Sequence, residues 1–160
     1  MELKSIEVKT PPNANVIIGQ AHFIKTVEDL YEVLVQAVPG IKFSVAFCEA
    51  SGPCLVRHTG TDRDLEQSAI DASLAIGAGH VFVVMLGNAF PVSVLNAVKA
   101  VSEVCTVFCA TGNSVRVIVA IDGDSRGVLG VIDGSAPKGV ETAADQAERR
   151  AMLRRFGYKQ

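Results

Sequence analysis

Apolar residues follow two spacings along the chain, one typical of strands and the other of helices. Short apolar or alternating runs of strand length occupy residues 3–9, 15–19, 41–50, 54–58, 80–87, 104–110, 115–121 and 128–134. Helical spacing of apolar residues, or a helix-start signal, follows Thr26, Thr61, Phe90 and Thr142. The pattern therefore predicts strands and helices that largely alternate through the first two thirds of the chain.

Three of the expected helices share a start signal. A threonine precedes an aspartate by three positions in the pairs Thr26 with Asp29, Thr61 with Asp64 and Thr142 with Asp145. In such a capping box the hydroxyl accepts a hydrogen bond from an early amide and the carboxylate returns to another. Each helix is therefore expected to begin at its threonine.

Two strand–helix–strand segments resemble each other. "VIIGQAHF" and, after a helix, "VAFCEASG" are echoed by "VMLGNAF" and "TVFCATGN". An internal duplication of strand–helix–strand units explains this register. Such units favour right-handed crossovers between parallel strands. We expect one domain over residues 1–160, an α/β fold with a layered, mixed and largely parallel central sheet.

Composition excludes several classes of partner. The chain has 15 basic and 17 acidic residues, a net charge of −2, so nothing indicates binding to nucleic acid or an anionic membrane. The longest apolar run, "VFVVML", is far shorter than a membrane span, and the first residues lack a signal-peptide core. We expect a cytoplasmic chain with reduced, buried cysteines. Because 49% of the residues are hydrophobic, we also expect a homo-oligomer.

Four polar loops are expected to form one site. In largely parallel sheets, ligands bind outside the carboxyl ends of the strands. That rule brings together "GQAH", "CEASG", "GNAF" and "CATGN", with Gln20, Ser51 and Asn88 as ligand contacts. The helix beginning at Thr26 would point its amide-rich end at the same place, which favours an anion.

His22 is the candidate catalytic residue of this site. A neutral imidazole can act as a base or as a nucleophile towards phosphorus. The alternative is a histidine that only orients the loop by hydrogen bonding. His80 precedes its strand, so it is expected at the opposite end of the sheet, and His58 is expected to be exposed.

Three charged residues complete the candidate set. Glu49 directly follows a buried strand and could hold a ribose diol, or simply pair with Arg57 or Lys25. Arg126 offers a fork suited to phosphate, or is a solvated hairpin charge. Lys25 or Arg126 would neutralise phosphoryl charge. No P-loop, no dinucleotide-binding glycine motif and no metal-ligand spacing occurs.

The runs "GQAHFIKTVEDLYEVL", "VAFCEASG", "IGAGH", "NAFPVSVLNAVK" and "RGVLGVIDG" resemble the adenosine-specific kinase family over residues 4–141. The resemblance implies an α/β/α sandwich, binding of adenosine and AMP rather than ATP, and a histidine that carries a phosphoryl group. We assign that histidine to His22, with His80 as the rival. "ATGNS" at 110–114 departs from the "ATANP" expected of relatives.

Two functions follow from this resemblance. The first is a phosphotransferase acting through a phosphohistidine, without an evident cofactor other than the Mg²⁺ that phosphoryl transfer normally requires. The second is a non-enzymatic sensor that binds adenosine or AMP in the same pocket. A scaffold that mainly self-assembles is a weaker third reading.

Overall fold

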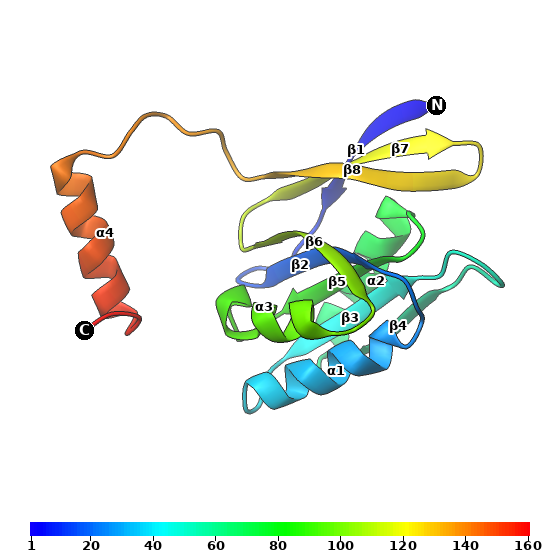
Figure 1. The fold of residues 1–160 in the computed structure, drawn as a ribbon, viewed down its shortest axis with the longest axis horizontal. Coiled ribbons are helices and arrows are strands. Elements are labelled where there is room, and N and C mark those ends of the chain that lie inside the picture. The colour runs from blue at the N-terminus through cyan, green and yellow to red at the C-terminus, as the bar shows by residue number, and fades with distance from the viewer.

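The computed structural model describes all 160 residues and contains two antiparallel sheets with four helices (Figure 1). The strands are β1 (Glu2–Val8), β2 (Asn15–Ala21), β3 (Phe43–Cys48), β4 (Val56–Gly60), β5 (Val81–Leu86), β6 (Val104–Thr111), β7 (Val115–Asp122) and β8 (Ser125–Asp133). The helices are α1 (Thr26–Ala37), α2 (Arg63–Ile76), α3 (Pro91–Ala100) and α4 (Ala143–Arg155). No helix has both the length and the apolar character that crossing a bilayer demands.

The prediction of a largely parallel central sheet is wrong. The larger sheet has the order β4-β3-β5-β2-β6, and every neighbouring pair in it is antiparallel. β5 lies between β2 and β3, so these two strands run in the same direction without touching. The misreading arose because every residue of β3 and β5 is buried. A central antiparallel strand covered on both faces shows the same unbroken apolar run as a parallel strand.

The expected α/β/α sandwich is also incomplete. Helices α1 and α3 pack on one face of the larger sheet around Leu30, Phe43 and Phe82. The other face is covered by α2 together with the smaller sheet, which has the order β1-β7-β8. One outer layer therefore mixes a helix with a sheet, as the arrangement around α2 in Figure 1 shows.

The two similar strand–helix–strand segments are interleaved. β2 and β3 flank β5, while β5 and β6 flank β2. Because β2 and β5 run in opposite directions, Gln20 pairs with Val81 at one end of the sheet and Asn15 with Leu86 at the other. The loops that leave β2 and β3 therefore emerge at one end, and those that leave β5 and β6 emerge at the opposite end.

The expected capping box forms in one case of three, although α1 does begin at Thr26 as expected. Thr142 and Asp145 form the expected capping box. Asp62, not Thr61, caps α2, because its carboxylate accepts from the Asp64 and Leu65 amides. Helix α1 has no side-chain cap, since the Thr26 hydroxyl donates to the Phe23 carbonyl instead.

The cysteines are all free, but only two are buried. Cys48 and Cys109 lie in the core, where burial raises the pKa of each thiol to about 11. Cys54 and Cys105 are exposed, contrary to the expectation that all four would be buried.

Gly19 allows the closest packing in the centre of the larger sheet. A Cβ atom at this position would lie 2.3 Å from Cζ of the buried Phe82 ring and 2.5 Å from the Thr106 carbonyl oxygen. The Thr106 oxygen is a backbone atom of the neighbouring strand, and the Phe82 ring is packed in the core. Neither contact can therefore be relieved by a simple side-chain rotation.

Gly19→Ala is expected to destabilise the protein by about 1–3 kcal/mol, the usual cost of overpacking a core. Urea unfolding followed by circular dichroism would measure it. Gly127→Ala is the matched control, because a Cβ at that strand position has nothing within 4 Å. Equal midpoints for the two variants would contradict the packing argument.

Candidate active site

His80 links the ends of two strands at one end of the larger sheet. Its amide donates to the Cys48 carbonyl at 2.7 Å, and its carbonyl accepts from the Ala21 amide at 3.0 Å. Its φ is 64°, in the left-handed region that a histidine seldom adopts. Backbone strain of this kind is often found at functional sites and has to be held in place by neighbouring structure.

His22 and His80 line one cavity of about 230 Å³, together with Phe23, Ile24, Phe47, Glu49, Ala50 and Ser51. The half-buried His80 ring stacks on Phe47, with 5.9 Å between centroids and 19° between planes. His22 is exposed, and its amide donates to the Glu103 carbonyl at 3.0 Å. The expectation that His80 lies far from the site is wrong, because β5 starts where the antiparallel β2 and β3 end.

Glu49 is held in place by the loop that follows β3. Its Oε2 accepts from the Leu55 amide at 2.8 Å, and its Oε1 accepts from Nε and Nη2 of Arg57, both at 2.9 Å. The Leu55 amide and then the Arg57 guanidinium lower the pKa of this carboxyl below its ordinary value. The ion pair with Arg57, the alternative weighed for this residue, is present in the structure.

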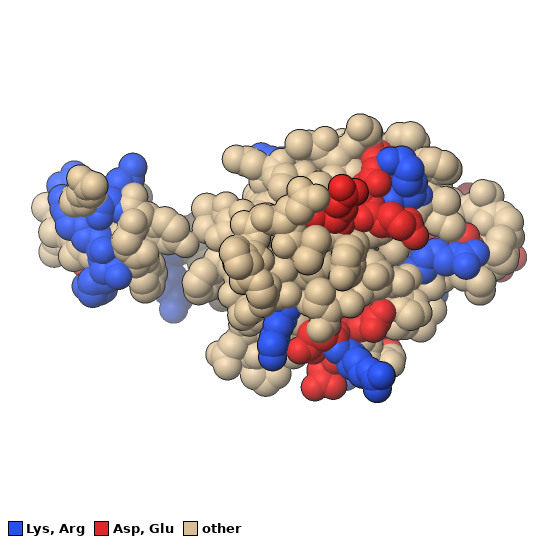
Figure 2. Space-filling model, turned by 90° about the horizontal axis from the view of Figure 1, so that it is seen from below, with Lys and Arg blue, Asp and Glu red and all other residues tan.

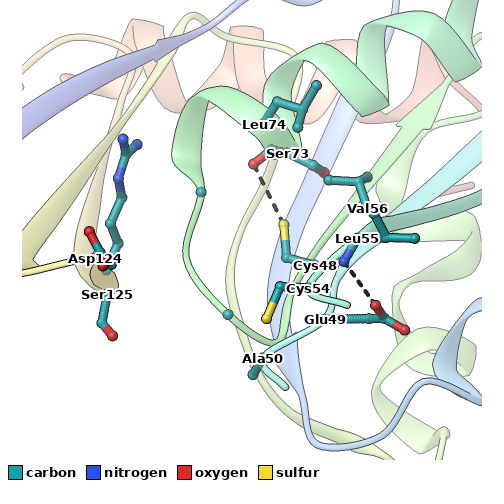
Figure 3. Close-up of a pocket in the computed structure, with 13 residues that line it drawn as sticks. Cys48, Glu49, Ala50, Cys54, Leu55, Val56, Ser73, Leu74, Asp124 and Ser125 are labelled. Atoms are coloured by element: carbon teal, nitrogen blue, oxygen red, sulfur yellow. Dashed lines mark hydrogen bonds between the residues drawn. The ribbon is translucent and has the colours of Figure 1, made fainter. Parts of the chain in front are cut away.

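A second cavity of about 440 Å³ adjoins the first and shares Glu49 and Ala50 with it. Its walls come from the loop after β3, the carboxyl end of α2 and the β7–β8 turn. Figure 3 shows Asp124 and Ser125 on one side of the opening and Cys48 with Glu49 on the other. The two cavities are therefore neighbours that meet at residues 49–50 and together make up the candidate site.

Ser73 places an unpaired hydroxyl in the wall of this larger cavity. The residue is fully buried, and its Oγ atom has no hydrogen-bond partner. Its carbonyl, by contrast, accepts from the Gly77 amide at 2.8 Å and from the Cys48 thiol at 3.5 Å (Figure 3). Buried polar atoms nearly always have a partner, so this hydroxyl is a candidate ligand contact, but a ligand would reach it only after a shift of the cavity wall, because the oxygen has no accessible surface.

Arg126 reaches across the larger cavity to the end of α2. Its Nη1 donates to the Ala75 carbonyl at 3.0 Å and to the Ile76 carbonyl at 3.3 Å. A cation at this end is favoured by the helix dipole and satisfies carbonyls that have no partner within the helix. Arg126 is thus a helix cap that also borders the cavity.

Lys25 is held by two carboxylates beside the histidine loop. Its Nζ contacts Asp29 and lies 2.8 Å from Oε1 of Glu103. These two carboxylates, Asp29 first, hold the pKa of Lys25 above its ordinary value, and Lys25 lowers the pKa of Asp29. Glu103 is only 3% exposed, and neither of its carboxylate oxygens has a hydrogen bond of good geometry. Lys25 is its only ion-pair partner.

Asn88 lies at the other end of the sheet from His22. Its Oδ1 accepts from the Lys42 amide at 2.7 Å, and its Nδ2 donates to the Gly40 carbonyl at 3.0 Å. The "ATGNS" loop lies at that same far end, where the Asn113 amide group donates to Asp133 at 3.1 Å. Since the loops do not converge as expected, the departure in "ATGNS" does not border the histidine cavity.

The start of α1 offers little to an anion. The Thr26 and Val27 amides donate to the Phe23 and Ile24 carbonyls at 3.0 and 3.2 Å, so neither is free. Of the other predicted contacts, Ser51 lines the histidine cavity, and Gln20 is exposed at the end of β2. No group of three or more His, Cys, Asp or Glu side chains lies together as metal ligands would.

Comparison with known proteins adds a family to this geometry. A family model described as "Adenosine specific kinase" matches residues 6–159. Among solved structures, the crystal structure of PH1918 protein from Pyrococcus horikoshii OT3 is 44% identical, with a TM-score of 0.95 over 99% of this chain and 98% of that chain. No curated protein matches.

Lys25→Met is expected to destabilise the protein more than the double variant Lys25→Met/Glu103→Gln. The single variant leaves the Glu103 carboxylate buried without a cation, whereas the double variant removes that charge as well. Thermal unfolding at pH 7 would give the two midpoints. A double variant with the same or a lower midpoint would show that the Glu103 charge does not matter to the fold.

Proposed function

Since the chain belongs to the adenosine-specific kinase family and its function is adenosine-related, we propose that it binds adenosine and AMP and transfers a phosphoryl group through a phosphohistidine. The observation that carries this proposal is the cavity shared by His22 and His80. Two imidazoles from different strand ends, with a carboxylate and a serine beside them, provide a nucleophile and a group for proton transfer.

His22 is the residue that we propose carries the phosphoryl group. It is the more exposed of the two histidines, so a donor can approach its ring. A lone pair of the neutral ring attacks phosphorus, and the bond from phosphorus to the leaving oxygen of a phosphate ester or anhydride breaks. A hydroxyl of adenosine then attacks, the P–N bond breaks, and the hydroxyl proton passes to a base such as His80. Mg²⁺ enters this scheme only as a companion of the donor's phosphates.

The nucleoside is proposed to occupy the larger cavity. Its volume of about 440 Å³ lies within the usual range of roughly 300–1,000 Å³ for ligand sites. The unpaired Ser73 hydroxyl would gain a partner there once the cavity wall shifts to expose it. Glu49 and Ser51 would line the passage to His22, and Arg126 would border the far side. Lys25 and Asn88 already have protein partners and are left out of this proposal, while Gln20 stays a prediction.

One observation favours the alternative, a sensor that binds adenosine or AMP without turnover. The cations near the two cavities are already engaged: Arg57 with Glu49, Arg126 with the end of α2, and Lys25 with two carboxylates. Phosphoryl transfer needs positive groups aimed at the transferred phosphate. Incubation with adenosine and a phosphoryl donor over hours separates the two functions, since a sensor forms no AMP.

His22→Asn is expected to abolish acid-labile labelling when the protein is incubated with radiolabelled phosphoryl donors. Phosphohistidine is lost in acid, whereas phosphoserine is retained, so the lability of the label identifies it. His80→Asn is expected to keep part of the label, because the nucleophile remains. His58→Asn is the control, since His58 pairs with Glu66 away from both cavities. Labelling that persists in His22→Asn and disappears in His80→Asn would reassign the role to His80.

Ser73→Ala is expected to weaken adenosine binding by about 2- to 10-fold, the worth of one hydrogen bond, without lowering stability. Removing an unpaired buried hydroxyl breaks no hydrogen bond within the protein. The adenosine affinity is therefore expected to fall while the stability of the fold stays the same. Calorimetric titration with adenosine would measure the affinity. Ser68→Ala is the matched control on the same helix, because that hydroxyl is bonded to the Asp64 carbonyl. Unchanged affinity in Ser73→Ala would remove the larger cavity from the proposal.

A further inference from the structure

Another cavity, of about 440 Å³, lies between the C-terminal arm and the body of the molecule. The arm (residues 135–160) is the extended segment after β8 together with α4, and Figure 1 shows it standing away from the rest of the chain. The walls of the cavity are residues 90–92 at the start of α3, residues 110–112 at the end of β6, and Phe156 and Tyr158 after α4. It shares no residue with the two cavities of the candidate active site.

The turn that follows α4 brings two aromatic side chains to this cavity. Gly157 has a φ of 80°, and its amide donates to the Arg154 carbonyl at 3.0 Å. The Tyr158 amide donates to the Leu153 carbonyl, also at 3.0 Å. These two hydrogen bonds form the Schellman ending of a helix, in which a glycine supplies the left-handed residue. Phe156 and Tyr158, on either side of that glycine, are therefore held where they both line the cavity.

The placement of the arm is shared with a solved relative. The arm makes up 26 of the 160 residues. A TM-score of 0.95 over 99% of this chain requires the arm to superpose as well, because a different placement of so many residues would lower the score. None of the 13 residues of α4 is buried, yet the arm has the same position in both proteins. The space between arm and body is therefore a property of the fold.

The lining of this cavity suits a flat and uncharged ligand. Phe90, Phe156 and Tyr158 are 65%, 65% and 50% exposed, so three aromatic rings that border one cavity leave apolar surface open to water. Lys, Arg, Asp and Glu are absent from the lining. Figure 2 shows basic side chains on the arm, whereas the part of the body beside it is largely uncharged. Gathered aromatic rings without charges are the surfaces on which nucleobases stack.

The cavity occupies the place in the second strand–helix–strand segment that the histidine cavity occupies in the first. Each is bordered by the residues between the first strand and the helix, where "GQAHF" supplies Phe23 and "GNAF" supplies Phe90. Each is completed by residues at or just after the end of the last strand of its segment. The two cavities lie at opposite ends of the larger sheet, because β2 and β5 are antiparallel. The second one has no histidine, so it offers a place to bind but no imidazole to accept a phosphoryl group.

We propose that this cavity is a second nucleoside site, in which the purine base of adenosine stacks against Phe90, Phe156 and Tyr158. The choice of a purine rests on the proposed function, whereas the aromatic walls do not depend on it. The volume of about 440 Å³ lies within the usual range of roughly 300–1,000 Å³ for ligand sites. A base bound there contacts both the arm and the body, so its binding joins the arm to the rest of the molecule.

Tyrosine fluorescence gives a direct readout of this site. The chain has two tyrosines and no tryptophan, so the emission of the variant Tyr31→Phe comes from Tyr158 alone. Tyr31 packs against Phe43, away from the cavity, and phenylalanine keeps that ring contact. Titration of Tyr31→Phe with adenosine, corrected for absorption by the nucleoside, is expected to quench the Tyr158 emission until the site is saturated.

Phe90→Ala and Phe156→Ala, each combined with Tyr31→Phe, are expected to raise the adenosine concentration at half-quenching by about 5- to 100-fold, the worth of one base–aromatic stack. Both rings are 65% exposed, so the far-ultraviolet circular dichroism spectrum is expected to stay unchanged. Phe23→Ala is the matched control. It removes the aromatic residue in the corresponding place of the histidine cavity and should leave the quenching of Tyr158 as it was.

Three results would overturn the proposal. The first is the absence of saturable quenching, whether the cavity stays empty or a second copy of the chain covers it. The second is quenching that persists unchanged in both Phe90→Ala and Phe156→Ala. The third is quenching that disappears in His22→Asn, because Tyr158 would then only report binding at the candidate active site.

The second site and the proposed function can fail separately. Quenching of Tyr158 without any phosphohistidine label would leave the second site standing alone, whereas labelling without quenching would remove only the second site. Should Tyr31→Phe fail to fold, the wild type can be compared with Tyr158→Phe, which keeps the aromatic wall and loses only the reporter. Equal quenching in these two proteins would also refute the second site.

Discussion

The pairing of β5 with both β2 and β3 is the constraint on which the candidate site depends. By entering between two strands that run the same way, β5 brings its first residues to the place where the other two end. His80 then bonds to Cys48 on one side and Ala21 on the other. A β5 in any other position would leave the two histidines on different parts of the surface, and the cavity between them would not exist.

The polar groups around the two cavities differ in how firmly they are held. Glu49 accepts hydrogen bonds from the Leu55 amide and from Arg57, which fixes a loop, and Arg126 donates from Nη1 to a helix end. The rings of His22 and His80 and the Ser73 hydroxyl are held less firmly by hydrogen bonds within the protein. A rigid surround with a few free polar atoms is the usual arrangement of a site that orients a small ligand without rearranging.

The sequence was informative about elements and much less so about how they assemble. The helices, most strands and the family could be read from it, because local spacing and motifs are local properties. Which strand pairs with which is decided over long distances in the chain, so "HVFVVMLG" gave no sign that it would separate β2 from β3. His80 was misplaced for that reason. Glu103, in "VSEVC", carried no signal at all, since its importance comes from burial next to Lys25.

The interleaving of the two strand–helix–strand segments has a consequence for how the chain acquires its structure. Each segment leaves a gap that only a strand of the other can fill. During synthesis the first segment therefore waits, with unsatisfied strand edges, until β5 has emerged. Neither half can serve as an autonomous folding unit, and separately expressed halves would need to find each other before either became ordered. Strongly non-local pairing of this type slows folding, and the strand edges that wait for a partner are exposed to aggregation.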